Sequence, residues 1–388
     1  MYNFDEIINR QGSSSVKYDS LKEVFGRDDI LPMWVADMDF QAPPSVLNAV
    51  REAAERGIFG YTFRSAESVG QFINWVKTRH NWEIKREWIT SAPGIVAALP
   101  VSIRAFTKPG DKILIQTPVY PPFHNIVKEN NRVLVTSPLK ESESGWDINW
   151  EDFENKLESG VKMFILCSSH NPLGRVWSME ELKKMGNLCV KYGVIIFSDE
   201  IHADLSLFGN THIPMASISE EIASTTITAM APSKTFNVAG MMNSVIITSS
   251  STLFSGYQSE LLSLHLDLGN IFGHISMEAA YSGGERWLDE LKEYLQKNID
   301  YAYDFLKREI PQISFRRPQS SFLLWMDFRN TGLTHTEVRE HLLNVCKLGL
   351  NDGLAFGPEG EGFFRMNIGT PLANVQEGLN RLKSGFTS

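Results

Sequence analysis

The sequence predicts an α/β protein with a mainly parallel sheet and a second, smaller α+β unit. Short apolar runs alternate with stretches of helical periodicity over most of the chain, a pattern typical of strands buried on both faces of a parallel sheet. After about residue 285 the alternation gives way to a long charged helix, a strand and another helix. A chain of 388 residues is long enough to bury a core in each unit.

The apolar runs define the elements in order. For the first unit we expect strands at 112–116, 132–136, 162–168, 194–199 and 244–249, with a shorter one within 224–230. Residues 180–193 have helical periodicity and end at a glycine, which suits a helix C-terminal cap. The second unit is expected to contain a helix over 286–310, a strand within 321–328 and a helix over 335–348.

The change of pattern near residue 285 sets the expected domain boundaries. Residues 49–284 form the large domain, residues 285–388 form the small domain, and residues 1–48 join the small domain, although their pattern alone fits either unit. No repeat, low-complexity tract or flexible linker divides the chain. We therefore expect the two domains to pack closely and to form a site between them.

Composition argues against several classes of function. The 46 acidic and 37 basic residues give a net charge of -9 and are spread along the chain, so nucleic acid is not expected as a partner. No basic stretch leads into an apolar run, and no span of about 20 apolar residues occurs. Cys167, Cys189 and Cys346 have neither disulfide-framework nor metal-ligand spacing. We expect free thiols, no metal site, no membrane contact and a cytoplasmic protein.

Three polar clusters follow predicted strands directly. They are SSHNPLGR at 168–175, SDEIH at 198–202 and APSKTF at 231–236. Because the carboxyl ends of parallel strands meet at the edge where an α/β sheet binds its ligand, the three clusters are expected to converge. Taken singly, each also fits an ordinary turn or helix cap.

Lys234 is a single cation in the small, mostly apolar segment AMAPSKTFNVAG at 229–240. Burial would lower the pKa of its amine and make it a nucleophile suited to Schiff-base chemistry. The alternative is that the side chain extends to water from the edge of a loop. The neighbouring clusters decide between these readings.

Together the clusters fit the chemical needs of pyridoxal phosphate. Lys234 would form the Schiff base, Asp199 would keep the pyridine nitrogen protonated, and Asn171 would donate to the phenolic oxygen. The phosphate would be held by the Ser233 hydroxyl and by backbone N–H groups at the start of a predicted helix in SAPGIVAAL, those of Gly94 and Ile95. Tyr120 in QTPVYPPF is placed to stack on the ring.

The ordered motifs resemble the fold-type I pyridoxal phosphate enzymes of the class I/II aminotransferase superfamily. These motifs are GYTF, PGIVAA, PVYPPF, SSHNPLGR, SDEIH, SKTFNVAG and FFRMNIGTP, which span residues 60–371. The resemblance implies a large domain with a mainly parallel seven-stranded sheet and a smaller α+β domain. Within the superfamily, the sequence is most similar to the MalY/PatB-type carbon–sulfur β-lyases, also called cystathionine β-lyases. The motifs that carry this similarity are MWVADMDF at 33–40, IQTPVYPPF, SSHNPLGRVW, SDEIHADL and APSKTFNVAG.

That resemblance implies an activity and an assembly. Such enzymes remove the α-proton of an L-cysteine S-conjugate, expel a thiol and release pyruvate and ammonia, and they are homodimers with a shared active site. Some MalY-type proteins also bind a transcription factor, although nothing in this sequence locates a surface for one. The alternative with the same cofactor is transamination of an aromatic or other neutral amino acid.

The resemblance also implies roles for single residues. Lys234 matches the Schiff-base lysine, which also shuttles the proton, and Tyr61 matches the tyrosine that reaches the cofactor phosphate of the neighbouring subunit. Arg365 matches the arginine that binds the substrate α-carboxylate. The alternative for Arg365 is a structural salt bridge. His202 stands where many aminotransferases have a tyrosine near the phenolic oxygen. Ala36 matches the segment that closes near the substrate carboxylate, where a backbone N–H is the expected contact.

Some positions depart from the family patterns. Met242 occupies the position, eight residues after Lys234, where common aminotransferases place a phosphate-binding arginine. Pro121 follows Tyr120 where some of these lyases have a second tyrosine. No second arginine clearly marks a pocket for a dicarboxylic side chain, although Arg64 and Arg317 are left as candidates. The aromatic residues Phe123 and Trp325 are expected in the core, and the alternative is that they line the pocket for the substrate side chain.

Overall fold

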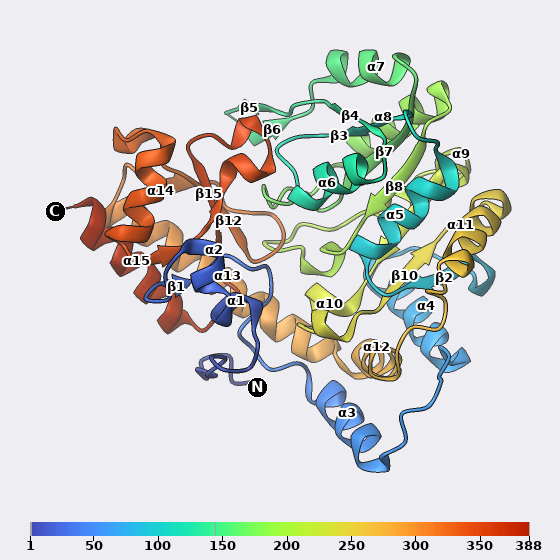
Figure 1. The fold of residues 1–388 in the computed structure, drawn as a ribbon, viewed down its shortest axis with the longest axis horizontal. Helices are drawn as coiled ribbons and strands as arrows, with labels where there is room; N and C mark the ends of the chain where they lie inside the picture. The colour runs from blue at the N-terminus through green and yellow to red at the C-terminus, as the bar shows by residue number, and fades with distance from the viewer. Residues whose placement is uncertain (1, 144, 388) are drawn as a thin grey trace.

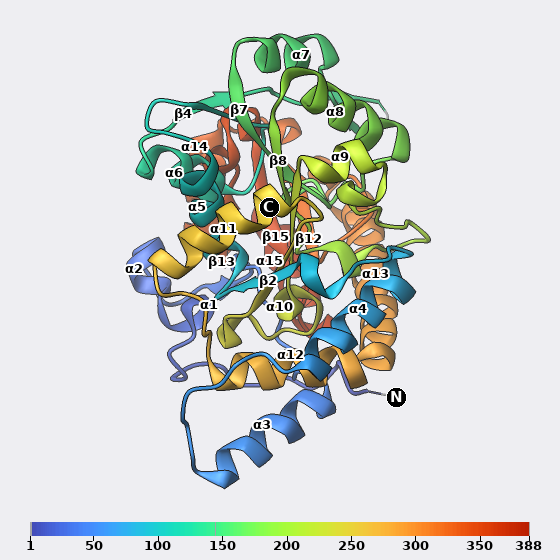
Figure 2. The same cartoon turned by 90° about the vertical axis from the view of Figure 1, so that its right-hand side faces the viewer.

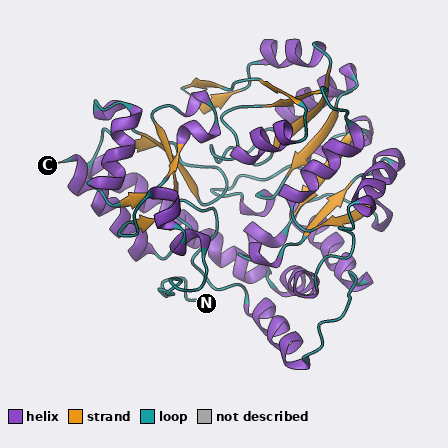
Figure 3. Cartoon of the chain, viewed as in Figure 1, coloured by secondary structure: helices purple, strands orange, loops and turns teal. Residues whose placement is uncertain are grey.

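Seven strands form the large sheet of the computed structural model, which describes residues 2–143 and 145–387 (Figures 1 and 3). Their spatial order is β2 (Ile89–Ala92), β10 (Ser244–Ile247), β9 (Thr226–Met230), β8 (Ile195–Asp199), β7 (Val161–Cys167), β3 (Lys112–Ile115) and β4 (Val133–Thr136). From β9 to β4 all neighbours are parallel, whereas β10 is antiparallel to both of its neighbours. The predicted α/β fold with a mainly parallel sheet is therefore confirmed.

Helices cover both faces of this sheet because alternate strand residues point to opposite sides. On one face Met163 and Ile165 of β7 pack in a core with α5 (Ile95–Phe106), α6 (Pro121–Glu129) and α11 (Ser251–Ser263). On the other face Phe164 and Leu166 pack with α7 (Trp150–Glu158) and α8 (Met179–Tyr192). The continuous apolar run of β7 thus reflects burial on both faces.

The ends of α8 follow directly from its sequence. Ser178 and Glu181 form a reciprocal capping box at the N-terminus, which satisfies two backbone N–H groups. Gly193 adopts a left-handed conformation with φ 65° at the C-terminus. The predicted helix over 180–193 is confirmed apart from its exact terminal residues.

The smaller sheet is four-stranded and antiparallel, in the order β11 (Ser314–Phe315), β12 (Leu323–Asp327), β15 (Phe363–Asn367) and β14 (Asn351–Asp352). The helices that accompany it are α13 (Glu285–Glu309), α14 (His335–Asn344) and α15 (Leu372–Phe386). The expected helix over 335–348 is too long. After Asn344 the chain turns through Lys347 at φ 51° and enters β13 (Leu348–Gly349), which pairs with β1 (Leu31–Pro32).

The N-terminal segment lies against the small unit before it crosses to the large one. It contains α1 (Val16–Asp19), α2 (Leu21–Phe25) and β1, whose pairing with β13 places it beside the small sheet (Figure 1). Next, α3 (Pro44–Arg56) packs against α12 (Ile271–Gly283), so the proposed boundary at residue 49 falls inside a helix. The three-part domain division stays a prediction. Figure 2 shows α3 and the stretch that follows it at the outer edge of the molecule.

Three simple features accompany this architecture. Among the described residues, no helix combines the length and the apolar character needed to cross a bilayer. Cys167, Cys189 and Cys346 are free, as expected, and all three are buried. Within residues 2–143 and 145–387, no group of three or more His, Cys, Asp and Glu side chains is arranged to hold a metal ion.

Candidate active site

The register of the parallel strands brings the three polar clusters to one edge of the sheet. Cys167 at the end of β7 is paired with Asp199 at the end of β8, and Asp199 is paired with Ala229 of β9. The chain therefore delivers Asn171 and Lys234 to the same edge, just beyond the strands. A cavity of about 390 Å³ lies there. Its lining includes Asn171, Lys234 and Asp199 together with Gly94, Ile95, Tyr120, His202, Ser233 and Asn243.

Lys234 extends into this cavity from α10 (Pro232–Thr235), the short helix after β9. Its Nζ donates a hydrogen bond to the Ala36 carbonyl. Burial is the main reason that its pKa falls to about 8, and the positive charge of Arg365 lowers it further against the opposing effects of Asp37 and Asp199. The amine is therefore a much better nucleophile near neutral pH than an exposed lysine.

Asp199 is a buried carboxylate that has no cationic side chain within hydrogen-bonding distance among the described residues. Its Oδ1 accepts a hydrogen bond from the backbone N–H of Ile201 at 3.1 Å. Burial is the main reason that the pKa of Asp199 rises to about 7; the charge of Glu200 also raises it, against the opposing effects of the Ile201 N–H and Lys234. Such a group favours a cation that enters the cavity beside it, for example the protonated nitrogen of a pyridine ring.

Arg365 and Asn171 are joined by a hydrogen bond from Arg365 Nη1 to Asn171 Oδ1 at 2.9 Å. Because a guanidinium only donates, this contact fixes the amide so that its nitrogen is left to donate elsewhere. Arg365 also donates to Asn351 Oδ1 at 2.6 Å and to the Trp34 carbonyl at 3.2 Å. All of these partners are neutral, so the structure gives no support to the structural salt bridge that was the alternative for Arg365.

Arg365 therefore keeps an uncompensated positive charge in a buried position. Burial lowers the pKa of its guanidinium to about 10, which still leaves it protonated at neutral pH. Its Nε has no hydrogen-bond acceptor among the described residues. A buried cation with a free donor and neutral partners is suited to binding a carboxylate.

Tyr120 and His202 complete the polar wall of the cavity. Burial raises the pKa of Tyr120, which stays protonated, and lowers the pKa of His202 to about 3, which keeps the imidazole neutral. Nδ1 of His202 is buried and has no partner among the described residues. A neutral imidazole in this state has a hydrogen-bonding site left for a ligand.

The opposite side of the cavity is built for an anion. Gly94 is the N-cap of α5, and Ile95 is its first residue, so the free backbone N–H groups of the helix start and the positive end of its dipole face this region. Ser233 adds a hydroxyl group. Met242 also lines the cavity and supplies no charge.

Arg64 lies behind this wall rather than in a substrate pocket. Its Nη2 donates to Asn243 Oδ1 at 2.5 Å and to the Ser244 carbonyl at 2.9 Å. Burial lowers the pKa of Arg64 to about 10. A second, half-buried cation thus lies behind Asn243, close to the anion-binding side. In this region Met242 stands in place of the arginine of common aminotransferases.

The segment over residues 34–37 was only partly anticipated, although it contacts both cations of the site. The Trp34 carbonyl accepts from Arg365, and the Ala36 carbonyl accepts from Lys234. The expected contact of the Ala36 backbone N–H with the substrate carboxylate stays a prediction. Asn367 Nδ2 donates to the Asp37 carbonyl at 2.6 Å. The motifs at 33–40 and 363–371 were the signal, but no pattern within them indicates that they touch.

Other predicted residues lie outside the cavity. Tyr61 is 98% exposed and lies in the stretch between α3 and α4 (Ala66–His80). Arg317 and Trp325 instead line a separate cavity of about 520 Å³ between the two units. Trp325 is buried and stacked on Phe363, and Phe123 is buried in the core of the large unit, as expected for both aromatic residues.

The chemistry of this donor set fits pyridoxal phosphate. The cavity offers a nucleophilic amine, a buried carboxylate that is hydrogen-bonded to no cationic side chain among the described residues, and the N-terminus of α5 for a phosphate. Nδ1 of His202, which has no partner among the described residues, and the amide nitrogen of Asn171 also line the cavity. Each of these groups would gain a partner from the cofactor.

Comparisons with known proteins agree with this fit. The model of the family described as "Aminotransferase class I and II" matches residues 28–382. Cystathionine beta-lyase PatB of Bacillus subtilis (strain 168) is 44% identical over 386 residues, which cover 99% of this chain and 100% of that protein. A pyridoxal phosphate-bound structure from Clostridium difficile 630 has a TM-score of 0.98 at 42% identity, with 100% of both chains covered. A pyridoxal phosphate-bound C-S lyase from Staphylococcus hominis has a TM-score of 0.93 at 33% identity and covers 100% of this chain and 99% of its own.

Proposed function

The chain belongs to the class I and II aminotransferase family, and from this premise we propose that it is a pyridoxal phosphate-dependent carbon–sulfur β-lyase. Its substrates are L-cysteine S-conjugates such as L-cystathionine, and its products are a thiol, pyruvate and ammonia. The observation that carries the proposal is the nucleophilic Lys234 in a cavity whose residues fit this cofactor, in a chain whose relatives over nearly its full length include a cystathionine β-lyase and a C-S lyase.

The residues of the cavity divide the work between binding and proton transfer. When bound, the cofactor supplies an electron sink for the carbanion that forms at the substrate α-carbon. We assign Lys234 to hold the cofactor covalently and to carry the α-proton, because its depressed pKa lets it take and return a proton near neutral pH. Asp199 holds the ring nitrogen protonated, Asn171 donates to the phenolic oxygen, and Arg365 holds the substrate carboxylate.

The remaining site residues are assigned to orientation. Tyr120 stacks on the ring, His202 donates or accepts near the phenolic oxygen, and Ser233 binds the phosphate together with the backbone N–H groups of α5. The carbonyl of Ala36 keeps the amine of Lys234 in place before the cofactor arrives.

We further propose that the enzyme is a homodimer in which Tyr61 completes the phosphate site of the partner subunit. In a single chain Tyr61 is exposed, as are the apolar side chains of Ile58, Phe59 and Phe63 in the same stretch. An exposed apolar stretch of this kind is suited to an interface. Burial against a second copy would account for it.

Pyruvate release from L-cystathionine by the cofactor-loaded enzyme, with no keto acid present, tests the activity. We expect catalytic pyruvate formation. A transaminase would instead need a keto acid to turn over an amino donor, and this alternative is less favoured because the named relatives include lyases. If cysteine conjugates give no pyruvate while an added keto acid restores turnover, the lyase assignment is wrong.

Lys234→Ala tests the central residue of the proposal. The variant should lose the visible absorbance of covalently held cofactor and nearly all pyruvate release, because no other lysine lines the cavity among the described residues. Met242→Ala is a matched control, since Met242 lines the same cavity with an uncharged side chain to which no role is assigned. Substantial steady-state turnover by Lys234→Ala would contradict the assignment.

A further inference from the structure

A hollow of about 330 Å³ adjoins the cofactor cavity and contains an ion pair that the proposed reaction does not use. Ala239 lines both spaces, and the hollow is lined on another side by Arg10 and Asp37. The backbone also links the two spaces, because Asp37 directly follows Ala36, whose carbonyl holds the amine of Lys234. A group bound beside Asp37 would therefore lie close to a substrate that reacts at Lys234.

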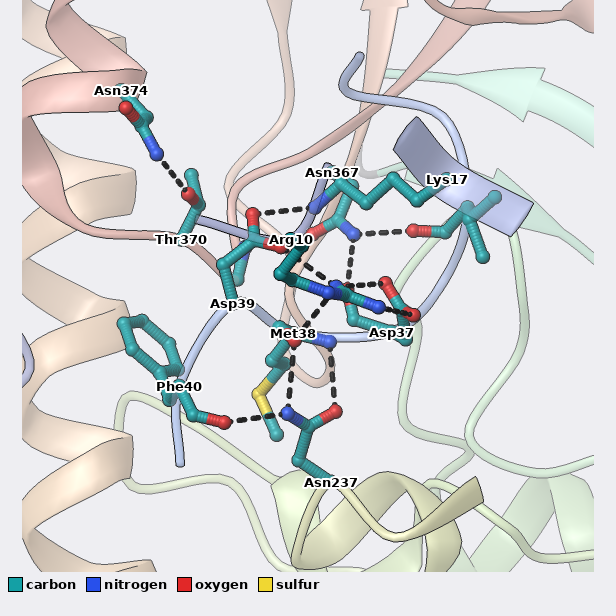
Figure 4. Close-up of polar contacts among 12 residues, drawn as sticks. Arg10, Lys17, Asp37, Met38, Asp39, Phe40, Asn237, Asn367, Thr370 and Asn374 are labelled. Atoms are coloured by element: carbon teal, nitrogen blue, oxygen red, sulfur yellow. Dashed lines mark hydrogen bonds and ion pairs between the residues drawn. The ribbon is translucent and has the colours of Figure 1, made fainter. Parts of the chain in front are cut away.

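Arg10 uses only part of its guanidinium within the protein (Figure 4). Its Nη1 and Nη2 donate to the two carboxylate oxygens of Asp37 at 3.1 and 2.7 Å. Nη1 also donates to Asp39 Oδ1 at 2.8 Å and to the Met38 carbonyl at 3.3 Å. The guanidinium has five N–H donors, and the edge formed by Nε and the second hydrogen of Nη2 has no acceptor among the described residues. Such an edge fits a carboxylate in a bidentate manner.

The cluster around this pair is electrically neutral. Lys17 is only 1% exposed and donates to Asp39 Oδ2 at 2.6 Å, so Asp39 is already compensated inside the protein. Arg10 and Asp37 form the outer pair, and each side chain is 23% exposed. Two cations and two carboxylates sum to zero, so a ligand with a net charge would leave an unbalanced charge in a partly buried place. A zwitterion has no net charge and would leave the cluster balanced.

We propose that Arg10 and Asp37 bind the far amino-acid group of a cysteine conjugate such as L-cystathionine. The carboxylate of that group lies on the free edge of Arg10, and its ammonium lies on the unused lone pairs of Asp37. The inference rests on the proposed function and deepens it, because such a subsite would make the enzyme prefer a conjugate with a second amino-acid end. Simple S-alkyl cysteines have no such end.

The test compares two substrates in the cofactor-loaded enzyme. The kcat/KM for pyruvate release is measured with L-cystathionine and with S-ethyl-L-cysteine in the wild type and in Arg10→Gln. We expect the ratio of the two values to fall by about tenfold or more, chiefly through the KM for cystathionine, because two charge-assisted hydrogen bonds are lost. Arg27→Gln is the matched control, since Arg27 pairs with Asp29 in the same N-terminal segment but outside the hollow, and its ratio should equal that of the wild type.

A second variant separates ligand binding from an effect on folding. Arg10→Lys keeps a cation beside Asp37 and Asp39 but has no second planar edge, so we expect it to lower the ratio as Arg10→Gln does. An unchanged ratio in both variants, or an equal loss on both substrates, would overturn the inference, since Arg10 would then only support the segment over 34–37. Absence of pyruvate from either substrate in the wild type is a distinct result, which would overturn the proposed function and this inference with it.

Discussion

At the scale of single residues, burial leaves two basic side chains of the same site in different protonation states. Burial lowers the pKa of Lys234 to about 8 and that of Arg365 to about 10. Near pH 8 the lysine is therefore about half neutral while the arginine stays protonated. The lysine can act as a nucleophile and the arginine as an anion receptor, although both line or adjoin one cavity.

The depressed pKa of Lys234 leads to a prediction for cofactor capture by the apoprotein. Only the neutral amine attacks, so the rate constant should rise with pH and reach half of its plateau near pH 8. The charged groups facing Lys234 are Asp37 and Asp199, which raise its pKa, and Arg365, which lowers it. Asp199→Asn should therefore move the midpoint to lower pH. Stopped-flow absorbance measures the rate, and a midpoint near that of a free lysine would contradict the proposed environment.

Arg365→Ala should weaken substrate binding rather than cofactor binding. It removes charge-assisted hydrogen bonds worth about 1.5–3 kcal/mol each, so the KM for cystathionine should rise by roughly tenfold or more. Arg365→Lys keeps the charge but lacks the planar fork and should recover only part of the loss. Steady-state kinetics give KM, and titration with cofactor serves as the control. Unchanged kinetics would show that another residue binds the carboxylate.

At the scale of elements, the start of α5 can be tested without altering a side-chain functional group. Ile95 is the first residue of α5, and its backbone N–H faces the proposed phosphate site. Proline is well tolerated at this first position, and Gly94 before it has the extended φ of 170° and ψ of 163° that a following proline allows. Ile95→Pro therefore removes one N–H donor and leaves the helix intact.

We expect Ile95→Pro to weaken cofactor affinity by about tenfold, the cost of one hydrogen bond to a charged group. Ile95→Ala is the matched control, because it loses the buried side chain but keeps the N–H. Fluorescence titration of the apoprotein with pyridoxal phosphate measures both dissociation constants. If the two variants bind equally well, the N–H of Ile95 does not contribute.

The elements also show which features the sequence can predict. β7 and β8 are long apolar runs followed by polar clusters, so both their position and the convergence of Asp199, Asn171 and Lys234 could be anticipated from strand geometry. β2, with the sequence ITSA, has no apolar run and was missed. The end of α14 was misplaced because pairing of β13 with β1 overrides helical periodicity.

The contacts of Arg10 and Lys17 could not be predicted for a related reason. Each residue is a lone cation in a polar segment, and nothing in the local pattern distinguishes it from a solvated side chain. Their partners, Asp37 and Asp39, lie more than twenty positions away and meet them only after the N-terminal segment folds back. The buried state of Lys17 is a property of the tertiary structure.

At the scale of the whole molecule, the site depends on how the two units meet. Arg365 lies on β15 of the small sheet, and the Asn171 that it contacts follows β7 of the large sheet, 194 positions earlier. The segment over 34–37 links the two units, because the Trp34 carbonyl accepts from Arg365 and the Ala36 carbonyl accepts from Lys234. Any shift of the small unit would therefore move the carboxylate receptor and the support of Lys234 together.

The proposed homodimer makes a prediction that a single chain cannot satisfy. If Tyr61 completes the partner's site, a purified hybrid of one Lys234→Ala chain and one Tyr61→Ala chain has one intact site and should show about half of the wild-type activity per dimer. A hybrid of a wild-type chain with a chain that carries both substitutions has no intact site. Its residual activity should therefore show the weakened cofactor binding of Tyr61→Ala.

The two hybrids give opposite results if Tyr61 serves its own chain. The doubly substituted chain would then leave its wild-type partner with a complete site, whereas the first hybrid would have none. Differently tagged chains allow each hybrid to be purified, and pyruvate release at limiting cofactor compares them directly. Because both hybrids contain the same two substitutions in total, a difference in stability or expression cannot produce the expected order, and only the sharing of Tyr61 across the interface can.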